Sequence, residues 1–404
     1  MPTTRLEGVL ASIARRVMPR AEADPLALCE ALLSGRGEAS GVALAREFFK
    51  QWANLGPPER REVLIGMAER FGPDRARLEQ AIEAWRAKPN PISESALHDA
   101  AEPRRQEVLR RLNLAPSGTG ALVRMREDVL RHLGGHPCLD ALDADFAHLF
   151  SSWFNRGFLA LRHIDWRTPA NILEKVMAYE AVHIIRDWDD LRRRLEPEDR
   201  RCFAFFHPQL ADEPLIFVEV ALTTAIPSGI GALLTEDRES VPAHEATTAV
   251  FYSISNCQEG LRGISFGNFL IKQVVEDLRS DLPQLKTFAT LSPVPGFAAW
   301  AAAERPGLGA ERGETLRAAA AYLLTAKTRS GKPLDPVARF HLGNGARLER
   351  LNHLGDPSPK GMRQAHGLMV NYLYEVDRIE ANHERFAEGE VVAAESVRAF
   401  LKGG

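Results

Sequence analysis

The chain has 404 residues, of which 45% are hydrophobic and 26% are charged, so it can bury a sizeable core and is not a disordered protein. Its 51 basic and 54 acidic residues leave a formal net charge of -3, which argues against a dedicated nucleic-acid binder. At about 100–200 residues per domain, this length predicts two domains, with three as the alternative.

The first third of the chain has helical periodicity. Residues 5–20 place arginines beside an apolar helical face, as mitochondrial presequences do, but Glu7 and the lack of serine enrichment favour an ordinary first helix. Three later segments repeat apolar residues at helical spacing: Leu78, Ile82 and Trp85; Val108, Leu109 and Leu112; Leu122, Met125, Val129 and Leu133. Proline and glycine clusters at 89–91 and 115–120 separate them. This pattern predicts an all-helical domain over residues 1–154.

After about residue 150 the pattern changes to short runs of β-branched and aromatic residues. Four such runs, each bounded by Pro, Gly, Asp or Asn, are predicted to be strands: 202–206, 215–222, 247–254 and 284–291. An amphipathic helix with Phe269, Val274, Val275 and Leu278 facing inward follows the third run. Helices are predicted to return at 316–326, 337–351 and 368–379. Residues 155–404 are therefore predicted to form a mixed α/β domain with C-terminal helices.

Neither a metal site nor a membrane span is predicted. The four cysteines lie far apart and form no CxxC pair: Cys29, Cys138, Cys202 and Cys257. This spacing indicates buried thiols in a reducing compartment rather than disulfides or zinc ligands. Three histidines lack a metal-binding spacing: His341, His353 and His366. The most apolar stretch, 288–303, contains two prolines and is too short to cross a bilayer.

A glycine-rich segment, 256–268, joins a predicted strand to a predicted helix. Its glycines would let backbone amides approach a ligand closely: Gly260, Gly263 and Gly267. Arg262 adds a cation, and a helix N-terminus favours anions. The segment indicates either a pyrophosphate cradle or a connection without a ligand. It is neither a Walker A loop nor a Rossmann fingerprint, because the residues that follow and the glycine spacing do not match.

The same segment contains Gly263-Ile-Ser-Phe-Gly267, which matches the G-x-S-x-G nucleophile elbow of serine hydrolases. An elbow turns directly off its strand, whereas several residues separate Ser265 from the strand end at Ile254. No convincing acid-then-histidine pair follows either. Ser265 is therefore predicted to cap the helix, and a serine hydrolase is the weakest functional alternative.

Two further segments place a polar side chain among apolar ones. The strand ending at Ser292 is followed by two prolines, so Ser292 has a fixed position at a strand end, where ligands meet open α/β sheets. Its alternative role is to start a turn before proline. His341 lies among apolar residues just before Asn344 and Gly345, where it could be either a catalytic or a structural histidine.

Taken together, these segments resemble the malonyl-CoA decarboxylase family. The matching stretches occur in the family's order over most of residues 155–380: 207–223, 252–255 with the glycine-rich segment, 291–297, 340–346 and 367–374. The resemblance implies an α+β protein, with an all-α helical oligomerisation domain over 1–154 and a catalytic domain of the GNAT acetyltransferase fold over 155–404. It also implies conversion of malonyl-CoA to acetyl-CoA and CO₂ without metal or prosthetic group, in a homodimer or homotetramer.

The family's functional residues map onto this sequence as follows. The catalytic residues would be Ser292, His341 and Tyr374. The residues that contact CoA or substrate would be Gln258, Gly260, Arg262, Gly263, Ile264, Ser265, Phe266, Gly267 and Asn268, together with Ser292 and His341. The family's pattern does not require serine at 265, which further weakens the elbow hypothesis. Four basic residues are candidates for the CoA 3′-phosphate: Arg347, Arg350, Lys360 and Arg363.

A mechanism follows from the chemistry of decarboxylation. Loss of CO₂ leaves an enolate, and a preorganised donor aimed at the thioester oxygen stabilises the transition state more than the ground state. His341 could be this donor and then a proton source, with Ser292 as a relay rather than a nucleophile. The alternatives are an acyl-CoA N-acyltransferase and a non-catalytic acyl-CoA sensor. The ending Leu-Lys-Gly-Gly404 replaces the peroxisomal tail of eukaryotic members, so we expect a bacterial cytoplasmic form without nucleic-acid or membrane partners.

Overall fold

The computed structural model describes residues 24–34, 37–264, 270–309 and 311–402. The predicted first helix at 5–20 and the predicted helix residue Phe269 lie outside these ranges. The chain divides into two compact units. One comprises Met1–Asn155 with Gln258–Ser265, and the other comprises Arg156–Cys257 with Phe266–Gly404. A short piece of the glycine-rich segment thus belongs to the helical unit, although both of its flanks continue into the other unit.

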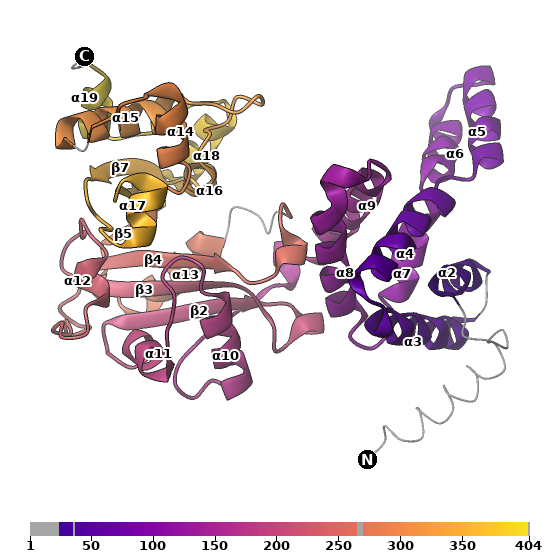
Figure 1. Cartoon of the computed structure of the whole chain (residues 1–404), viewed down its shortest axis with the longest axis horizontal. Helices are drawn as coiled ribbons and strands as arrows, with labels where there is room; N and C mark the ends of the chain where they lie inside the picture. The colour runs from indigo at the N-terminus through magenta and orange to yellow at the C-terminus, as the bar shows by residue number, and fades with distance from the viewer. Residues whose placement is uncertain (1–23, 35–36, 265–269, 310, 403–404) are drawn as a thin grey trace. The chain divides into compact units, whose positions relative to one another are not determined.

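The described part of the first unit is helical, without a strand, as the periodicity predicted. Its helices drawn in indigo to purple in Figure 1 are α2 (Pro25–Leu33), α3 (Glu38–Asn54), α4 (Pro57–Arg70), α5 (Arg75–Ala87), α6 (Pro91–Ala101), α7 (Arg104–Leu112), α8 (Gly118–His132), η1 (Leu133–Gly135) and α9 (Cys138–Trp153). The glycine-rich segment adds η4 (Glu259–Leu261) to this unit. Side chains of α3, α4, α7, α8 and α9 form the core of this unit: Phe48, Leu64, Leu109, Met125 and Phe146.

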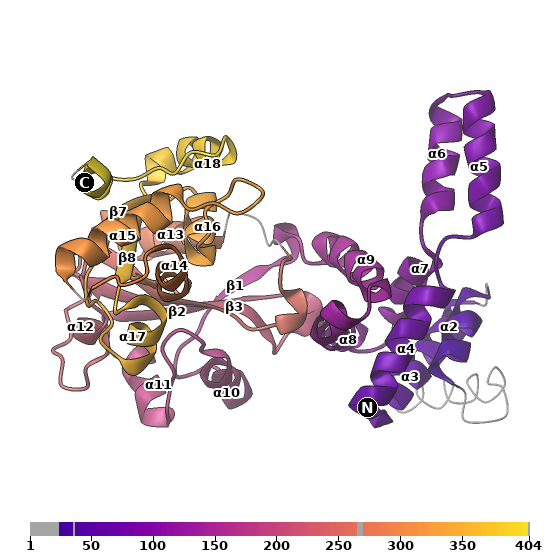
Figure 2. The ribbon, with the colours of Figure 1, turned by 45° about the horizontal axis from the view of Figure 1, so that its top comes forward.

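Helices α5 and α6 form a hairpin that extends from the other helices of this unit (Figure 2). Asn90 caps α6 by accepting hydrogen bonds from two backbone amides of its first turn. Helix α5 has no buried residue, and Trp85 and Ile92 are exposed by 37% and 82%. The apolar stripe of α5 that the sequence revealed is therefore only partly covered by the described part of this chain: Leu78 and Ile82 are half-buried, and Trp85 is exposed.

The second unit contains an eight-stranded sheet in the order β1-β2-β3-β4-β5-β8-β6, with β7 also paired to β8. Its strands are β1 (Ala160–His163), β2 (Arg200–Phe206), β3 (Pro214–Thr223), β4 (Thr248–Asn256), β5 (Thr287–Thr290), β6 (Ser292–Pro293), β7 (Arg347–Asn352) and β8 (Met369–Leu373). All pairs are antiparallel except β4–β5. The four predicted strands are present as β2 to β5, and the expected mixed sheet with surrounding helices is confirmed.

Helices surround this sheet and complete the second unit. They are η2 (Arg156–Phe158), α10 (Ala170–Tyr179), α11 (Trp188–Leu195), η3 (Pro208–Leu210), α12 (Gly231–Leu234), α13 (Leu270–Asp281), α14 (Phe297–Glu304), α15 (Arg312–Thr325), α16 (Pro336–Gly343), α17 (Pro359–Ala365), η5 (Val376–Arg378), α18 (Ile379–Ala387) and α19 (Glu395–Lys402). Helices α10 and α11 bury Val176 and Leu191 against Ala204 and Phe217 of the sheet (Figure 1). Across the described ranges, every helix is too short or too polar to cross a membrane.

Two of the predicted C-terminal helices were wrong in part. The predicted helix 337–351 ends as α16 at Gly343, and β7 follows it. The predicted helix 368–379 is mainly β8, which lies between β5 and β7 and is buried on both faces. A strand buried on both faces lacks the polar alternation that marks a strand, so its apolar run resembles a buried helix. Strand β1 was not predicted, because it is largely exposed and offers no apolar run.

Strand β5 pairs with only the first part of β4, in a parallel arrangement. Its register runs from Thr248 opposite Thr287 to Phe251 opposite Thr290, whereas β4 continues to Asn256. After Thr290 the chain leaves β5, and from Ser292 it pairs with β8 as β6. The end of β4 therefore has no strand partner on the β5 edge, although β3 pairs with its other edge, and its side chains line a space beside Ser292.

Candidate active site

The three predicted catalytic residues converge in the second unit. Ser292 begins β6, His341 lies in the last turn of α16, and Tyr374 directly follows β8. The Ser292 Oγ is 3.1 Å from Nε2 of His341, and the Tyr374 hydroxyl is 2.9 Å from Nδ1 of the same ring. These side chains come from positions 49 and 33 residues apart in the chain, so the tertiary structure assembles them.

Helix α16 holds His341 in place through its first turn. Asp335 caps the helix by accepting a hydrogen bond of 2.8 Å from the amide of Ala338, and Pro336 occupies the first turn, where a missing N–H costs nothing. Asp335 is fully buried, and the Tyr322 hydroxyl also donates to it at 3.4 Å. The start of the helix is thus anchored to the interior, which restricts the position of His341 two turns later.

The hydrogen-bond partners of His341 fit one tautomer of the neutral ring. The Ser292 hydroxyl donates to Thr290 Oγ1 at 2.8 Å, so its oxygen can accept a bond from Nε2–H of His341. The Nδ1 atom can then accept from the Tyr374 hydroxyl. This arrangement fits a neutral imidazole that presents an N–H at Nε2, on the side of Ser292.

Burial keeps both rings of this network uncharged at neutral pH. His341 is 3% exposed, and desolvation lowers its pKa from 6.5 to about 3. Desolvation also raises the pKa of Tyr374 well above its usual range, so its hydroxyl keeps its proton. His341 is consequently a hydrogen-bond donor rather than a cation at physiological pH.

A cavity of about 250 Å³ lies against Ser292 and His341. Its other walls are mainly apolar and include Tyr252, Ile254, Pro293, Pro336, Val337 and Phe340. Tyr252 and Ile254 belong to the end of β4 that extends beyond its pairing with β5, while β3 still pairs with the other edge of β4. A small acyl group with one polar end would fit such a pocket, because Ser292 and His341, which are hydrogen-bonded to each other, lie together among its mainly apolar described lining residues.

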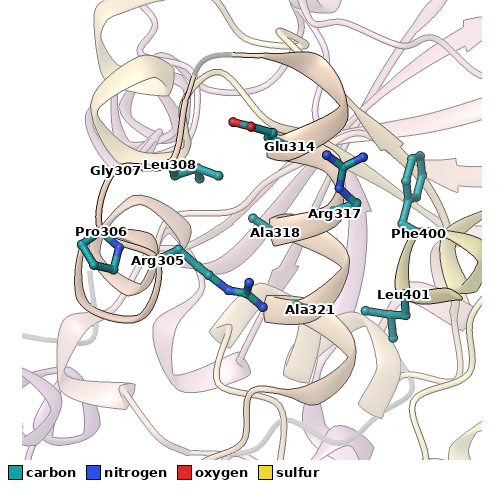
Figure 3. Close-up of a pocket in the computed structure, with 10 residues that line it drawn as sticks. All are labelled: Arg305, Pro306, Gly307, Leu308, Glu314, Arg317, Ala318, Ala321, Phe400 and Leu401. Atoms are coloured by element: carbon teal, nitrogen blue, oxygen red, sulfur yellow. The ribbon is translucent and has the colours of Figure 1, made fainter. Parts of the chain in front are cut away.

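A second hollow in the same unit, of about 460 Å³, lies among α14, α15 and α19 (Figure 3). Arg305, Leu308, Glu314, Arg317, Phe400 and Leu401 are among its described lining residues. Within that lining no serine, cysteine, histidine or tyrosine is present. This larger hollow therefore does not provide the acid–base chemistry found beside β6.

The predicted CoA-contacting residues fall in two groups. Those from Ser265 to Asn268 lie outside the described residues, whereas Gln258 to Ile264 belong to the helical unit. A side chain at Gly260 would collide with the carbonyl oxygen of Val123 in α8, so close packing on that helix provides a reason for glycine here. Arg262 pairs with Glu259 at 2.6 Å, and both side chains are 60% exposed.

Three of the four candidates for the CoA 3′-phosphate have other partners. Arg350 donates to the carbonyls of Ile226 and Pro227, at 2.9 and 2.8 Å. Lys360 donates to the carbonyls of residues 181 and 182, and Arg347 pairs with glutamates 349 and 375. A phosphate would have to compete with these bonds, so they are weaker candidates than their charge suggests.

Two residues of the site were missed by the sequence reasoning. Thr290 accepts from Ser292 and also from the amide of Tyr372, at 3.1 Å. The Tyr372 ring stacks on His341 with centroids 4.7 Å apart. Thr290 could have been found, since residues two apart on a strand share a face and Ser292 was already a candidate. Tyr372 could not, because its segment was predicted to be a helix.

The remaining titratable clusters do not suggest a metal site. Among the described residues, no group of three or more His, Cys, Asp or Glu side chains is placed to hold a metal ion. All four cysteines are free thiols. Burial raises the pKa of Cys29, Cys202 and Cys257 well above the usual range, so these thiols are poor nucleophiles.

Comparison with known proteins places these observations in a family. The malonyl-CoA decarboxylase C-terminal domain model matches residues 157–312 and 310–404, and the N-terminal domain model matches residues 71–154. Curated relatives include the mitochondrial malonyl-CoA decarboxylases of Anser anser anser (34% identity over 88% of this chain and 82% of the relative) and Mus musculus (31% identity, 94% and 88%).

Solved structures agree with the family models over nearly the whole chain. The malonyl-CoA decarboxylase from Rhodopseudomonas palustris is 56% identical, with a TM-score of 0.89, and the match covers 94% of this chain and all of that one. The enzyme from Agrobacterium vitis is 57% identical, with a TM-score of 0.87 and coverage of 94% and 99%. The chain therefore belongs to the malonyl-CoA decarboxylase family.

Proposed function

We propose that this chain converts malonyl-CoA to acetyl-CoA and CO₂. The observation that carries the proposal is the arrangement of Ser292, His341 and Tyr374 beside a mainly apolar cavity of about 250 Å³. Membership of the decarboxylase family supports the same reaction. Consumption of malonyl-CoA, the activated two-carbon donor, would connect the enzyme to fatty acid metabolism.

His341 is proposed to stabilise the enolate. When the bond between the methylene carbon and the carboxylate breaks, CO₂ leaves and the electron pair moves onto the thioester oxygen. With substrate bound, the neutral Nε2–H that contacts Ser292 in the free enzyme donates to that oxygen; it bonds more strongly to the enolate than to the ground-state carbonyl, and so lowers the barrier. The pKa of about 3 explains why the donor is neutral, and Tyr374 keeps the proton on Nε2.

Ser292 is proposed to act as a relay. Its hydroxyl contacts both His341 and Thr290, so it can turn toward the malonyl carboxylate or pass a proton while remaining hydrogen-bonded. The nascent acetyl carbon takes up one proton, supplied in the end by water. The apolar walls weaken solvation of the carboxylate and favour release of neutral CO₂. These roles require no metal or prosthetic group, so we propose that none takes part.

One assay separates the competing functions. Purified protein is incubated with malonyl-CoA, without metal or ATP, while CO₂ and acetyl-CoA are measured. The proposal predicts one CO₂ and one acetyl-CoA for each malonyl-CoA consumed. An acyl-CoA N-acyltransferase would instead consume acetyl-CoA only with an amine, a sensor would bind without turnover, and a hydrolase would release malonate and CoA. Any of these three outcomes would overturn the proposal.

The helical unit is proposed to assemble the chain into a homodimer or homotetramer. The exposed apolar side chains of the α5–α6 hairpin, Trp85 and Ile92, support this, because they are not covered within the described chain. We further propose a cytoplasmic enzyme whose partners are malonyl-CoA and acetyl-CoA, without nucleic acid or membrane. The balanced charge supports the absence of a nucleic-acid partner.

A further inference from the structure

We propose that Arg126, in the helical unit, is a positioning residue for CoA binding, because it orients the backbone of the glycine-rich segment. Arg126 lies in α8 and has no sequence motif around it that indicates a function. It rests on the proposed function in one respect: the ligand of the segment is taken to be the pyrophosphate of CoA.

Arg126 is bound on several sides by hydrogen bonds. Its Nη1 donates to the carbonyl oxygens of Gly260 at 2.8 Å and Arg262 at 2.9 Å, and its Nε donates to Asp143 at 2.7 Å. The residue is only 3% exposed, so its guanidinium is not available to a ligand in solvent. Asp143 compensates the charge locally, and Nη1 binds the two backbone carbonyls.

Neighbouring residues of α8 hold the same turn. The carboxylate of Glu127 accepts a hydrogen bond from the amide of Gly260, and Val123 packs so closely that only glycine fits at 260. Helix α8 thus engages both the N–H and the C=O of Gly260. The first turn of the glycine-rich segment is held by the helical unit rather than by the strand that precedes it.

The hydrogen bond from Arg126 to the Arg262 carbonyl also fixes the direction of the next backbone amide, that of Gly263. In a planar trans peptide, the C=O of one residue and the N–H of the next point in opposite directions. With the Arg262 carbonyl held toward Arg126, the amide of Gly263 must point away from α8. Gly263 has φ of +80°, and none of the described residues packs where its side chain would be, so on their side an anion can approach this amide closely.

Arg126 therefore acts on affinity for CoA without touching it. A carbonyl that turned toward the pyrophosphate would repel it, whereas an amide turned toward it donates a hydrogen bond. Without Arg126, the peptide groups that follow Gly260 and Arg262 can rotate. Each could then turn its carbonyl, an acceptor, toward the pyrophosphate in place of its N–H donor. This change should raise the Kd for CoA and the KM for malonyl-CoA and leave kcat nearly unchanged, because Ser292, His341 and Tyr374 are held by other elements.

The test compares Arg126→Ala and Arg126→Lys with Arg124→Ala, which removes the same charge from an exposed position on the same helix. CoA binding is measured by isothermal titration calorimetry, decarboxylation by steady-state kinetics, and folding by circular dichroism and thermal unfolding. Arg126→Ala should raise Kd and KM about tenfold, since hydrogen bonds from a charged donor contribute about 1.5–3 kcal/mol and 1.4 kcal/mol is a factor of ten. Arg126→Lys, which can hold only part of the network, should show a smaller increase.

The outcomes separate the two proposals. If folded Arg126→Ala matches Arg124→Ala in both Kd and KM, or loses kcat with an unchanged KM, the positioning role is wrong. If Arg126→Ala does not fold, Arg126→Lys decides by the same criteria. If wild-type protein binds CoA but releases no CO₂ from malonyl-CoA, the proposed function fails, and the Kd comparison still tests Arg126.

Discussion

The phenol ring of Tyr372 lies over the imidazole of His341, with ring centroids 4.7 Å apart and planes inclined by 25°. Both residues are buried, and Tyr372 covers one face of the imidazole. Water therefore cannot solvate a charged ring from that side, which contributes to the burial that lowers the pKa of His341 to about 3. The contact explains how a histidine serves as a neutral hydrogen-bond donor at neutral pH.

Replacing His341 should remove decarboxylation and spare CoA binding. His341→Ala takes away the donor aimed at the enolate oxygen, and loss of one such donor costs about 10²–10³ in kcat. Steady-state release of CO₂ and calorimetric binding of CoA measure the two effects separately. Turnover at the wild-type rate would contradict the assignment of His341.

Replacing Ser292 tests whether it is a relay or a nucleophile. Ser292→Ala should lower kcat by about tenfold to a hundredfold, within the range of a single proton-transfer group, and should leave residual activity. Intact-mass spectrometry of wild-type enzyme during turnover should show no acyl adduct. An adduct that appears in wild type and disappears in Ser292→Ala would establish covalent catalysis instead.

Removing the Tyr374 hydroxyl should weaken catalysis through His341. Tyr374→Phe leaves Nδ1 without its donor, which costs about 1–3 kcal/mol for a buried group and releases the ring to the other tautomer. The expected result is a fall in kcat of about tenfold with little change in KM, because about 1.4 kcal/mol is a factor of ten.

Tyr372→Phe is the matched control for this prediction. The hydroxyl of Tyr372 makes no hydrogen bond within the described structure, and its ring alone stacks on His341. This variant should keep nearly wild-type kinetics. Equal losses in Tyr372→Phe and Tyr374→Phe would mean that the site responds to any change in packing and that the bond to Nδ1 has no special role.

Acidification should destabilise the fold through buried histidines. Burial lowers the pKa of His341 to about 3 and of His183 to about 4, while both titrate near 6.5 when unfolded. Above pH 6.5 neither state binds these protons; below it only the unfolded state does, so stability falls until the folded pKa is reached. Between pH 7.5 and 5, each histidine should cost about 2 kcal/mol of unfolding free energy at 1.36 kcal/mol per pH unit.

Urea unfolding at the two pH values checks this prediction. His183→Gln should show a smaller loss of stability on acidification than wild type. His244→Gln, at a side chain that is 80% exposed, should show the wild-type loss. A pH response that is the same in all three proteins would assign the effect to other groups.

The α5–α6 hairpin offers a test of assembly. Ile92→Asp places a charge on a side chain that is 82% exposed, so the monomer fold should be unaffected. Light scattering coupled to gel filtration should show a smaller species, because a buried charge at an interface is costly. Ser95→Asp, on the same helix, adds the same charge at an exposed polar position and should not change the mass. Equal masses for wild type and Ile92→Asp would exclude the hairpin from the interface.

Local patterns in the sequence were sufficient for much of this protein. Helical periodicity identified the helical unit, and short β-branched runs identified β2, β3 and β4. The order of short motifs indicated the family and singled out Ser292, His341 and Tyr374. In the structure, Ser292 and Tyr374 each lie within hydrogen-bonding distance of one ring nitrogen of His341. Each of these features depends on residues that are near one another in the chain.

Tertiary structure decided the rest, because it depends on neighbours remote in sequence. Strand β8 was mistaken for a helix since burial on both faces removes its alternation. The low pKa of His341 comes from enclosure by segments such as that of Tyr372, and no local pattern reports enclosure. The proposed role of Arg126 depends on hydrogen bonds to Gly260 and Arg262, which lie more than a hundred positions later in the chain. Packing between distant segments determines how well the His341 ring is solvated and which way the backbone of the glycine-rich segment points. These two properties determine proton donation and the proposed binding of the ligand.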